Sequence, residues 1–501
     1  MEKTFICTED YPVVETKAGR LRGYQVDSTF HFLGVQYASA KRFHQPEPVQ
    51  PWEGVRDAQF FGPVCPLLDE ENPAGDVMIP HRFWPKSEDC LTLNVWTQSI
   101  DPAARKPVMV WFHGGGYSTG SSVEMVAYDG DHLSAFGDVV VVTVNHRLNI
   151  LGYFDLREFG EEYANSGNAG QADLVESLRW VRDNIAAFGG DPDNVTIFGQ
   201  SGGGGKVNAM MTTPAAEGLF HRAILMSGVG GRREPMPRVS MKPLAEALLK
   251  ALGLSDIHEL ETVPFEHLRE AYASLGRQAG MGFWAPTPNG WYLGDPYEVG
   301  YLDWAKDIPV MVGSVIAEWG FAPAPRGRAQ MPESEKRGLI AAQFGEENAD
   351  TLIRLFRAAF PEKDVTDLLA ISNRLGTMEF CAYRAETCRA KAYNYLFAFN
   401  FDYDGGKPAW HCSDIPFAFH NIDRVPICYK SGVSEKLEAE VAGAYVAFAR
   451  YGDPNHAGMA YWPAYTAEKP VTMFWDDESR ASDKDLALQQ LHGQVGPKGP
   501  F

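Results

Sequence analysis

Short, mostly apolar runs recur along the chain and predict the strands of a central sheet. The clearest is Pro107-Val-Met-Val-Trp-Phe112, and runs of the same kind occupy residues 139–144, 195–198, 223–227, 309–313 and 394–400. Strands with so few polar residues are covered on both faces, which is typical of a parallel sheet. We therefore expect a large, mostly parallel sheet with helices on both faces.

Between these runs, apolar residues return at helical spacing. Residues 171–188 carry one such stripe, at Leu174, Leu178, Val181 and Ile185, and Asn168 is a candidate N-cap for this helix. Similar stripes occur in residues 240–280 and 435–450. Strands that alternate with helices over most of a chain predict a doubly wound α/β sheet, here with insertions.

The first 60 residues have a different pattern, because apolar and polar positions alternate there around glycines. This pattern predicts a small N-terminal antiparallel region ahead of the main sheet. No segment rich in proline, serine or charge marks a boundary, so residues 1–501 are expected to form a single domain.

Gly199-Gln-Ser-Gly-Gly203 follows the run at 195–198 and fits the pattern G-x-S-x-G. In a nucleophile elbow a strand turns sharply into a helix and holds its serine in a strained conformation, with glycines where backbones approach closely. An ordinary glycine-rich turn is the alternative. A phosphate-binding loop is excluded, because Gln200 stands where its first glycine belongs and Val207 follows Lys206. Ser201 is thus a candidate nucleophile whose assignment depends on its partners.

Ligands of open α/β sheets bind outside the carboxyl ends of the strands, and this rule selects partners for Ser201. His113-Gly-Gly-Gly116 directly follows the run at 107–112, where its backbone N–H groups could bind a substrate oxyanion. The alternative is a flexible glycine turn. Two such motifs, each after its own strand, favour a hydrolase.

The acid is selected by the same rule. Glu318 follows the run at 309–313, whereas Asp307 precedes that run and would lie at the wrong end. Asp295 and Asp303 have no strand to aim them. We therefore expect Glu318 to be the acid, with a surface ion pair as the alternative.

A histidine serves best as the base, because it accepts and returns a proton near neutral pH. His411 comes after the run at 394–400, and His420 is the fallback. His456 lies in a turn and His492 in a polar tail. His411 is the expected base.

Charge and composition narrow the possible partners. Among 501 residues, 65 are acidic and 45 basic, which gives a net charge of −20 without a long basic cluster, so neither nucleic acid nor a membrane is an expected partner. The first ten residues lack the apolar core of a signal peptide, and the seven cysteines, an odd number, fit a reducing compartment, so we expect a cytoplasmic protein. Since C-x-x-C and H-E-x-x-H motifs do not occur, neither a metal nor another cofactor is expected. The oligomeric state stays open.

Longer motifs extend along nearly the whole chain. They include Ser87-Glu-Asp-Cys-Leu-Thr-Leu-Asn94, Trp111-Phe-His-Gly-Gly-Gly116, Ala187-Phe-Gly-Gly-Asp-Pro192, Ala317-Glu-Trp-Gly320 and Phe448-Ala-Arg-Tyr-Gly-Asp-Pro-Asn455. With these motifs the sequence resembles the type B carboxylesterase family, which includes carboxylesterases, cholinesterases and bile-salt-activated lipases. The resemblance implies an α/β-hydrolase fold and a serine esterase that needs no cofactor.

The resemblance also implies a role for individual residues. Its catalytic triad is Ser201, Glu318 and His411, and its oxyanion hole consists of the N–H groups of Gly115, Gly116 and Gly202. Ser227 matches a serine close to the acid, and Arg42 with Glu88 and Arg147 with Asp173 match structural ion pairs. Cys65 and Cys90 match a disulfide of secreted relatives, but here we expect free thiols.

The sequence departs from the family pattern around the nucleophile. Gln200 replaces the usual Glu and Gly202 the usual Ala, and Asn289 stands where Asp is usual. Gly204 and Gly205 are unexplained, since each glycine in a helix costs about 1 kcal/mol relative to alanine.

We expect a carboxylic-ester hydrolase that acts through an acyl-enzyme on a small-molecule substrate, an uncharged ester of small to medium acyl chain. The amide of Gln200 carries no charge that would attract a cationic ester. The alternatives are a non-catalytic binding or adhesion protein on the same fold, or a lactonase or thioesterase with the same triad.

Overall fold

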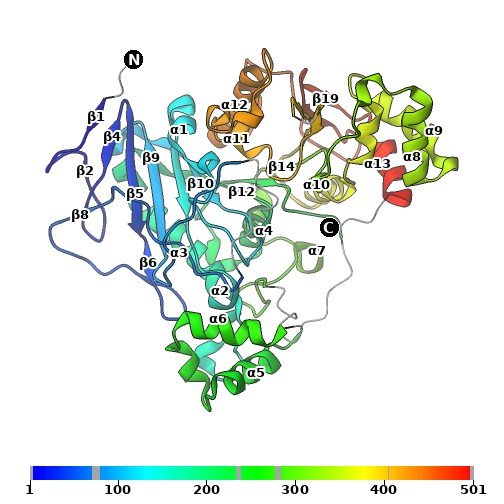
Figure 1. Ribbon diagram of the computed structural model, residues 1–501. Helices are drawn as coiled ribbons and strands as arrows, with labels where there is room; N and C mark the ends of the chain where they lie inside the picture. Colours follow the sequence, from blue (N-terminus) through cyan, green and yellow to red (C-terminus); the bar gives the residue numbers. More distant parts are fainter. Residues whose placement is uncertain (1–3, 70–78, 233–238, 277–283, 404, 497–501) are drawn as a thin grey trace.

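A computed structural model describes residues 4–69, 79–232, 239–276, 284–403 and 405–496. Within these residues the chain forms a 12-stranded sheet whose strand order is β1-β4-β5-β9-β11-β10-β12-β13-β14-β15-β18-β19. The N-terminal strands lie at one end of the sheet and the C-terminal strands at the other (Figure 1). In this order the strands are Phe5–Ile6, Tyr24–Val26, Thr29–Gln36, Thr92–Thr97, Val140–Val144, Lys106–Phe112, Gly190–Gln200, Arg222–Met226, Val310–Val315, Ala392–Phe397, Thr472–Trp475 and Arg480–Ser482.

The middle of the sheet is parallel, as the unbroken apolar runs predict. Strands β11, β10, β12, β13, β14, β15 and β18 pair parallel with their neighbours. The antiparallel pairs lie toward the two edges, where β9 pairs with β11 and β19 with β18. The carboxyl ends of the parallel strands therefore meet at one edge, where a site can assemble.

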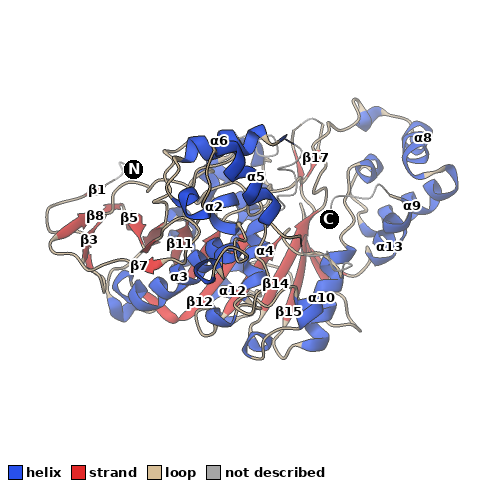
Figure 2. Ribbon diagram, turned by 90° about the horizontal axis from the view of Figure 1, so that it is seen from below, coloured by secondary structure: helices blue, strands red, loops and turns tan. Residues whose placement is uncertain are grey.

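Alternating residues of β10 enter two different cores. Val108 and Val110 pack in the core that contains the predicted stripe of α3 (Ala169–Asn184). Met109 and Trp111 pack in the core that contains the stripe of α12 (Ser434–Tyr451). Because side chains of a strand alternate between faces, helices must cover both faces, as Figure 2 shows.

The remaining helices surround this sheet. They are α1 Asp131–Gly137, α2 Asn149–Tyr153, α4 Gly202–Met210, α5 Lys242–Leu252, α6 Phe265–Ser274, α7 Pro296–Val299, α8 Glu333–Phe344, α9 Glu346–Ala359, α10 Leu375–Thr387, α11 Ile415–Ala418 and α13 Leu486–Val495. Helices α5 and α6 confirm the amphipathic pattern of residues 240–276, and residues 277–280 lie outside the described part of the chain. In the part of the chain that the structure describes, no helix has the length and apolar character to cross a membrane.

The N-terminal region differs in part from the expectation. Strands β4 and β5 are antiparallel, but they extend the main sheet and do not stand apart from it. A separate small sheet does form from β2 (Val13–Glu15), β3 (Arg20–Arg22) and β8 (Val55–Asp57), and its β3–β8 pair is parallel. The short pairs β6 (Ala38–Ser39) with β7 (Glu47–Pro48) and β16 (Asn400–Phe401) with β17 (Lys407–Pro408) complete the strands.

Asn168 does stand at the start of α3, but the prediction that its side chain caps the helix is wrong. Its amide donates to the Thr287 carbonyl at 2.8 Å, and its side-chain oxygen accepts from the Thr287 N–H at 2.8 Å. The side chain therefore ties the beginning of α3 to a distant loop, a contact that helix-end preferences cannot reveal.

Candidate active site

The candidate nucleophile stands between β12 and α4, in a strained turn. Ser201 has φ +57° and ψ −127°, a region that residues with a side chain rarely adopt. A Cβ at Gly203 would overlap the carbonyl oxygen of Phe112, so only glycine lets α4 begin so close to β10. The Ser201 side chain is half-buried. These are the features that the G-x-S-x-G pattern predicts.

The loop His113–Gly116 leaves the carboxyl end of β10 and packs against this turn. Gly115 and Gly116 have φ values of +79° and +62°. A Cβ at Gly114 would lie 3.5 Å from the Ser201 Cβ, and a Cβ at Gly202 would lie 2.5 Å from the Gly116 nitrogen. The glycine loop and the first residue of α4 are therefore in direct backbone contact beside Ser201.

The candidate acid and base are hydrogen-bonded to each other. Glu318 Oε2 lies 2.6 Å from His411 Nδ1, and the backbone N–H of His411 donates to the backbone carbonyl of Glu318 at 3.1 Å. The other carboxylate oxygen accepts from the Val315 N–H at the end of β14, at 3.1 Å. Since the carboxylate accepts at Nδ1, that nitrogen carries the proton and Nε2 is the basic one.

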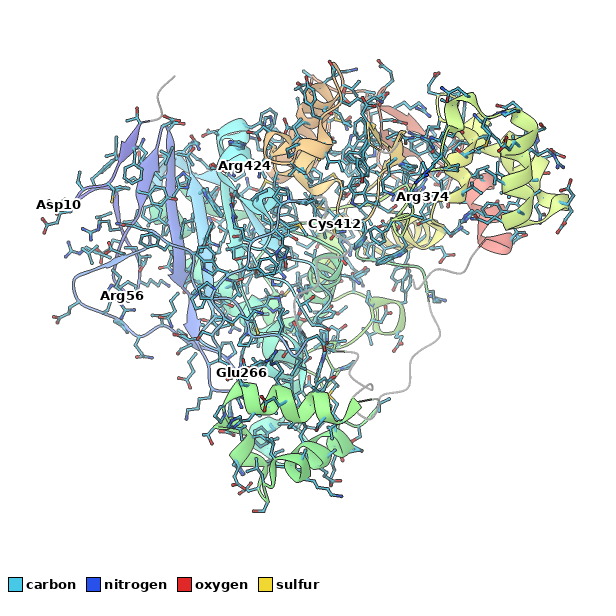
Figure 3. All side chains as sticks on the ribbon, viewed as in Figure 1. Asp10, Arg56, Glu266, Arg374, Cys412 and Arg424 are labelled. Atoms are coloured by element: carbon cyan, nitrogen blue, oxygen red, sulfur yellow. The ribbon has the colours of Figure 1, made fainter. Side chains whose placement is uncertain are left out.

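Gln200 connects this pair to the nucleophile. Its Nε2 lies 3.3 Å from His411 Nε2 and 3.4 Å from Nδ1, and such similar distances place the amide over the face of the ring. Its Oε1 accepts from the thiol of Cys412 at 3.2 Å. Cys412 lies in the middle of the molecule (Figure 3). The imidazole is therefore held next to the residue that precedes Ser201.

A buried carboxyl that no sequence pattern indicates, Asp414, lies close to the Glu318–His411 pair. Its Oδ2 accepts from the Tyr395 hydroxyl at 3.1 Å. Burial, with a further contribution from the Glu318 carboxylate, raises the pKa of Asp414 to about 7. Its position three residues after His411 gave no signal, because only its complete burial in the fold makes it unusual.

An exposed aromatic pair borders the base. The Trp319 indole stacks on the His411 ring with centroids 4.9 Å apart and 21° between the planes. Phe321 meets Trp319 edge-on at 6.0 Å, and the two side chains are 39% and 41% exposed, respectively. Apolar surface that stays exposed beside a site is suited to contact a ligand.

The competing residues have other contacts. Asp303 and Asp307 bind Arg389, and Asp295 caps α7. The fallback His420 stacks on Phe136, with centroids 4.3 Å apart.

The residues implied by the resemblance lie as follows. Arg42 Nε donates to Glu88 at 2.8 Å, and Arg147 Nε to Asp173 at 2.9 Å, so both expected ion pairs form. The Ser227 N–H donates to the Gly313 carbonyl at 2.8 Å, but its hydroxyl makes no hydrogen bond within the described residues, and its role near the acid stays a prediction.

The structure also explains one of the unexpected glycines. A Cβ at Gly204 would lie 2.9 Å from the Gly228 Cα, closer than side chains pack, so α4 approaches the end of β13 only with glycine there. Gly205 is less restricted, since a Cβ would meet the Tyr117 hydroxyl at 3.3 Å.

Comparisons with known proteins agree over nearly the whole chain. A model of the carboxylesterase family matches residues 10–492. The para-nitrobenzyl esterase of Bacillus subtilis is 31% identical over 492 residues, which cover 93% of this chain and 95% of that protein. Phenmedipham hydrolase of Pseudarthrobacter oxydans is 34% identical over 506 residues, which cover 95% of this chain and 97% of that protein.

A solved structure has the same fold. It is described as an esterase from anaerobic Clostridium hathewayi that can hydrolyze aliphatic aromatic polyesters. It matches with a TM-score of 0.94 at 48% identity, over 99% of this chain and 100% of that one. The expected α/β-hydrolase fold is thereby confirmed.

Proposed function

Because the chain belongs to the carboxylesterase family and is a carboxylic-ester hydrolase, we propose that Ser201, Glu318 and His411 form its catalytic triad. One observation carries this assignment. The hydrogen-bonded Glu318–His411 pair lies against Gln200, directly before a serine held at a positive φ. A serine hydroxyl needs such a base to become a nucleophile, and the base needs a third group to orient it.

In this proposal the Ser201 hydroxyl attacks the ester carbonyl while His411 Nε2 takes its proton. The negative charge that develops on the carbonyl oxygen is stabilised by the N–H groups of Gly115, Gly116 and Gly202, which form the oxyanion hole. His411 then protonates the departing alcohol, and Glu318 stabilises the imidazolium throughout. Water, activated by the same histidine, finally hydrolyses the acyl-enzyme.

We further propose that the substrates are uncharged esters with small to medium acyl chains, including esters with an aromatic group. The Gln200 amide, where cholinesterases have a carboxylate, offers no charge to a cationic ester. The exposed Trp319–Phe321 pair beside His411 offers an aromatic surface to a flat substrate group. The 48% identical esterase described as hydrolysing aliphatic aromatic polyesters supports the same substrate class.

We also propose that the protein is located in the cytoplasm. The odd number of cysteines in a chain of this length supports a reducing compartment, in which Cys65 and Cys90 would stay thiols.

The proposal is tested with purified protein on p-nitrophenyl esters of acetate, butyrate, octanoate and benzoate. We expect turnover of all four, with a burst of p-nitrophenol that equals the enzyme concentration where deacylation is slow. Thioester and lactone substrates in the same assay separate the reaction subclasses. Reproducible inactivity on every ester would contradict the proposal and favour a binding protein on this fold.

A further inference from the structure

A lysine that the proposed mechanism does not use lies beneath the oxyanion loop. Lys206 belongs to α4, five residues after Ser201, and is 0% exposed. Its ammonium donates a hydrogen bond of 2.9 Å to the carbonyl oxygen of His113, the residue at which the glycine loop begins. Within the described residues, no carboxylate forms an ion pair with it.

A buried ammonium without an ion-pair partner is costly, so its presence calls for an explanation. Burial lowers the pKa of Lys206 to about 7, and the carboxylate of Glu124 acts from a distance against that shift. The remaining titratable neighbours give it little support. The centroid of the Tyr117 ring lies 5.8 Å from Lys206 Nζ. The imidazoles of His113 and His146 stack on each other, and burial holds the pKa of each well below its usual value.

We propose that Lys206 is a positioning residue of the oxyanion hole, whose ammonium holds the His113 carbonyl and thereby fixes the Gly114–Gly116 backbone for the tetrahedral intermediate. The carbonyl that it binds belongs to the peptide unit that leads into Gly114, so the hydrogen bond fixes the orientation of the loop at its root. The charge also makes this hydrogen bond stronger than a neutral one. This inference rests on the proposed role of Ser201 as the nucleophile, and it adds a positioning residue to the same active site.

A structural role alone would have different consequences. A lysine that merely ties α4 to β10 would lower stability when replaced, but each correctly folded molecule would keep its rate. A positioning residue instead changes kcat per active site and leaves KM nearly unchanged, because the oxyanion exists only in the transition state and the intermediate.

The test compares Lys206→Met, whose unbranched side chain is one atom shorter and carries no charge, with Lys336→Met as a matched control. Lys336 is also buried but lies on α8 and pairs with Asp364 at 2.6 Å. Active sites are counted by titration with an organophosphate, and kcat and KM are measured on a p-nitrophenyl ester. We expect K206M to lose about tenfold to a hundredfold in kcat with KM within about twofold, and K336M to keep its kcat.

The pH dependence distinguishes the charge from simple packing. Lys206 is charged below its pKa, so kcat of the unmodified enzyme should fall as pH rises through the region where the ammonium loses its proton, and K206M should lack this fall. A K206M enzyme with the kcat of the unmodified protein, or a ratio of the two that stays constant from about pH 6 to pH 10, would overturn the proposal.

If K206M does not fold, Lys206→Gln keeps a donor without the charge and is expected to show a smaller loss of kcat. If neither variant folds, the unmodified enzyme decides alone, since a kcat that shows no fall as pH rises from about 6 to 10 overturns the proposal, whatever rise His411 causes at the acid end. Failure of the Ser201 assignment would be seen separately, as activity that survives in Ser201→Ala.

Discussion

Replacing Gly202 by alanine tests how closely the glycine loop packs on α4. Alanine is the usual residue here in the family that the sequence resembles, so a harmless outcome would be the ordinary expectation. In this structure, however, a Cβ at Gly202 would lie 2.5 Å from the Gly116 nitrogen and would overlap the Gly116 Cα and carbonyl oxygen. All three atoms belong to backbone, which cannot swing aside as a side chain does.

The size of the effect follows from this distance. A carbon atom packs at about 3.5 Å or more from atoms to which it is not bonded, so the loop would have to move by about 1 Å. An oxyanion donor works only within about 2.7–3.1 Å of the oxygen, and losing one donor lowers kcat by about 10²–10³-fold, or about 3–4 kcal/mol of transition-state stabilisation. We therefore expect Gly202→Ala to lose about a hundredfold in kcat with little change in KM.

The assay is steady-state hydrolysis of a p-nitrophenyl ester, normalised to titrated active sites. Gly205→Ala is the matched control on the same helix, because its Cβ would meet only a side-chain hydroxyl, at 3.3 Å, and a carbonyl oxygen at 3.7 Å. That control should keep its kcat and gain up to about 1 kcal/mol of stability from the better helix residue. A Gly202→Ala enzyme whose kcat stayed within about threefold of the unmodified protein would show that the glycine loop tolerates a Cβ at position 202, contrary to this prediction.

Three further predictions concern stability, selectivity and the cysteines. Because the pKa of Asp414 is raised to about 7, the folded protein binds a proton there that the unfolded chain releases near pH 4, so stability should fall as pH rises between these values. Asp414→Asn should remove that fall, so it should raise Tm at pH 8 but not at pH 4. The gain in the free energy of unfolding at pH 8 should not exceed about 4 kcal/mol, and a pH dependence of Tm that the substitution leaves unchanged would contradict the raised pKa. With Gln200 beside the nucleophile, kcat/KM for a neutral alkyl ester should exceed that for its isosteric choline ester, and a choline preference of about tenfold that persists at high salt would contradict this. Cys65 and Cys90 are buried, so they should be alkylated when cells are lysed in denaturant with an alkylating reagent and no reductant, and a bridge between them in the mass spectrum would contradict a cytoplasmic location.

Much of the fold could be predicted because buried parallel strands have few polar residues. The runs at 107–112 and 195–198 lie in neighbouring strands β10 and β12, and both are followed by the glycine motifs that the site requires. The apolar stripes predicted for α3 and α12 are confirmed as buried, because helical spacing indicates which side of a helix faces a core. The prediction of a separate N-terminal region is only partly confirmed, because an alternating pattern identifies strands but not the sheet that they join.

The contacts of the site could be predicted less well. Glu318 and His411 could be predicted from their positions after strands, because parallel strands bring their carboxyl ends to one edge of the sheet. In the structure Glu318 Oε2 lies 2.6 Å from His411 Nδ1. No pattern placed the Gln200 amide over the imidazole ring, since that contact depends on how two distant loops pack. In the sequence Lys206 is notable only beside the excluded phosphate-binding pattern, and its hydrogen bond to His113 is visible only once α4 is placed beside β10.

Covalent labelling combined with kinetics tests whether Ser201 is the nucleophile. The unmodified enzyme and Ser201→Ala are treated with a fluorophosphonate, digested and sequenced by mass spectrometry, and kcat is measured for both on p-nitrophenyl butyrate. We predict a label on Ser201 and on no other serine of the unmodified enzyme, no label in the variant, and a kcat of the variant about 10⁴- to 10⁶-fold lower. A variant that kept most of its esterase activity, or a label on another serine, would contradict the assignment of Ser201 as the nucleophile.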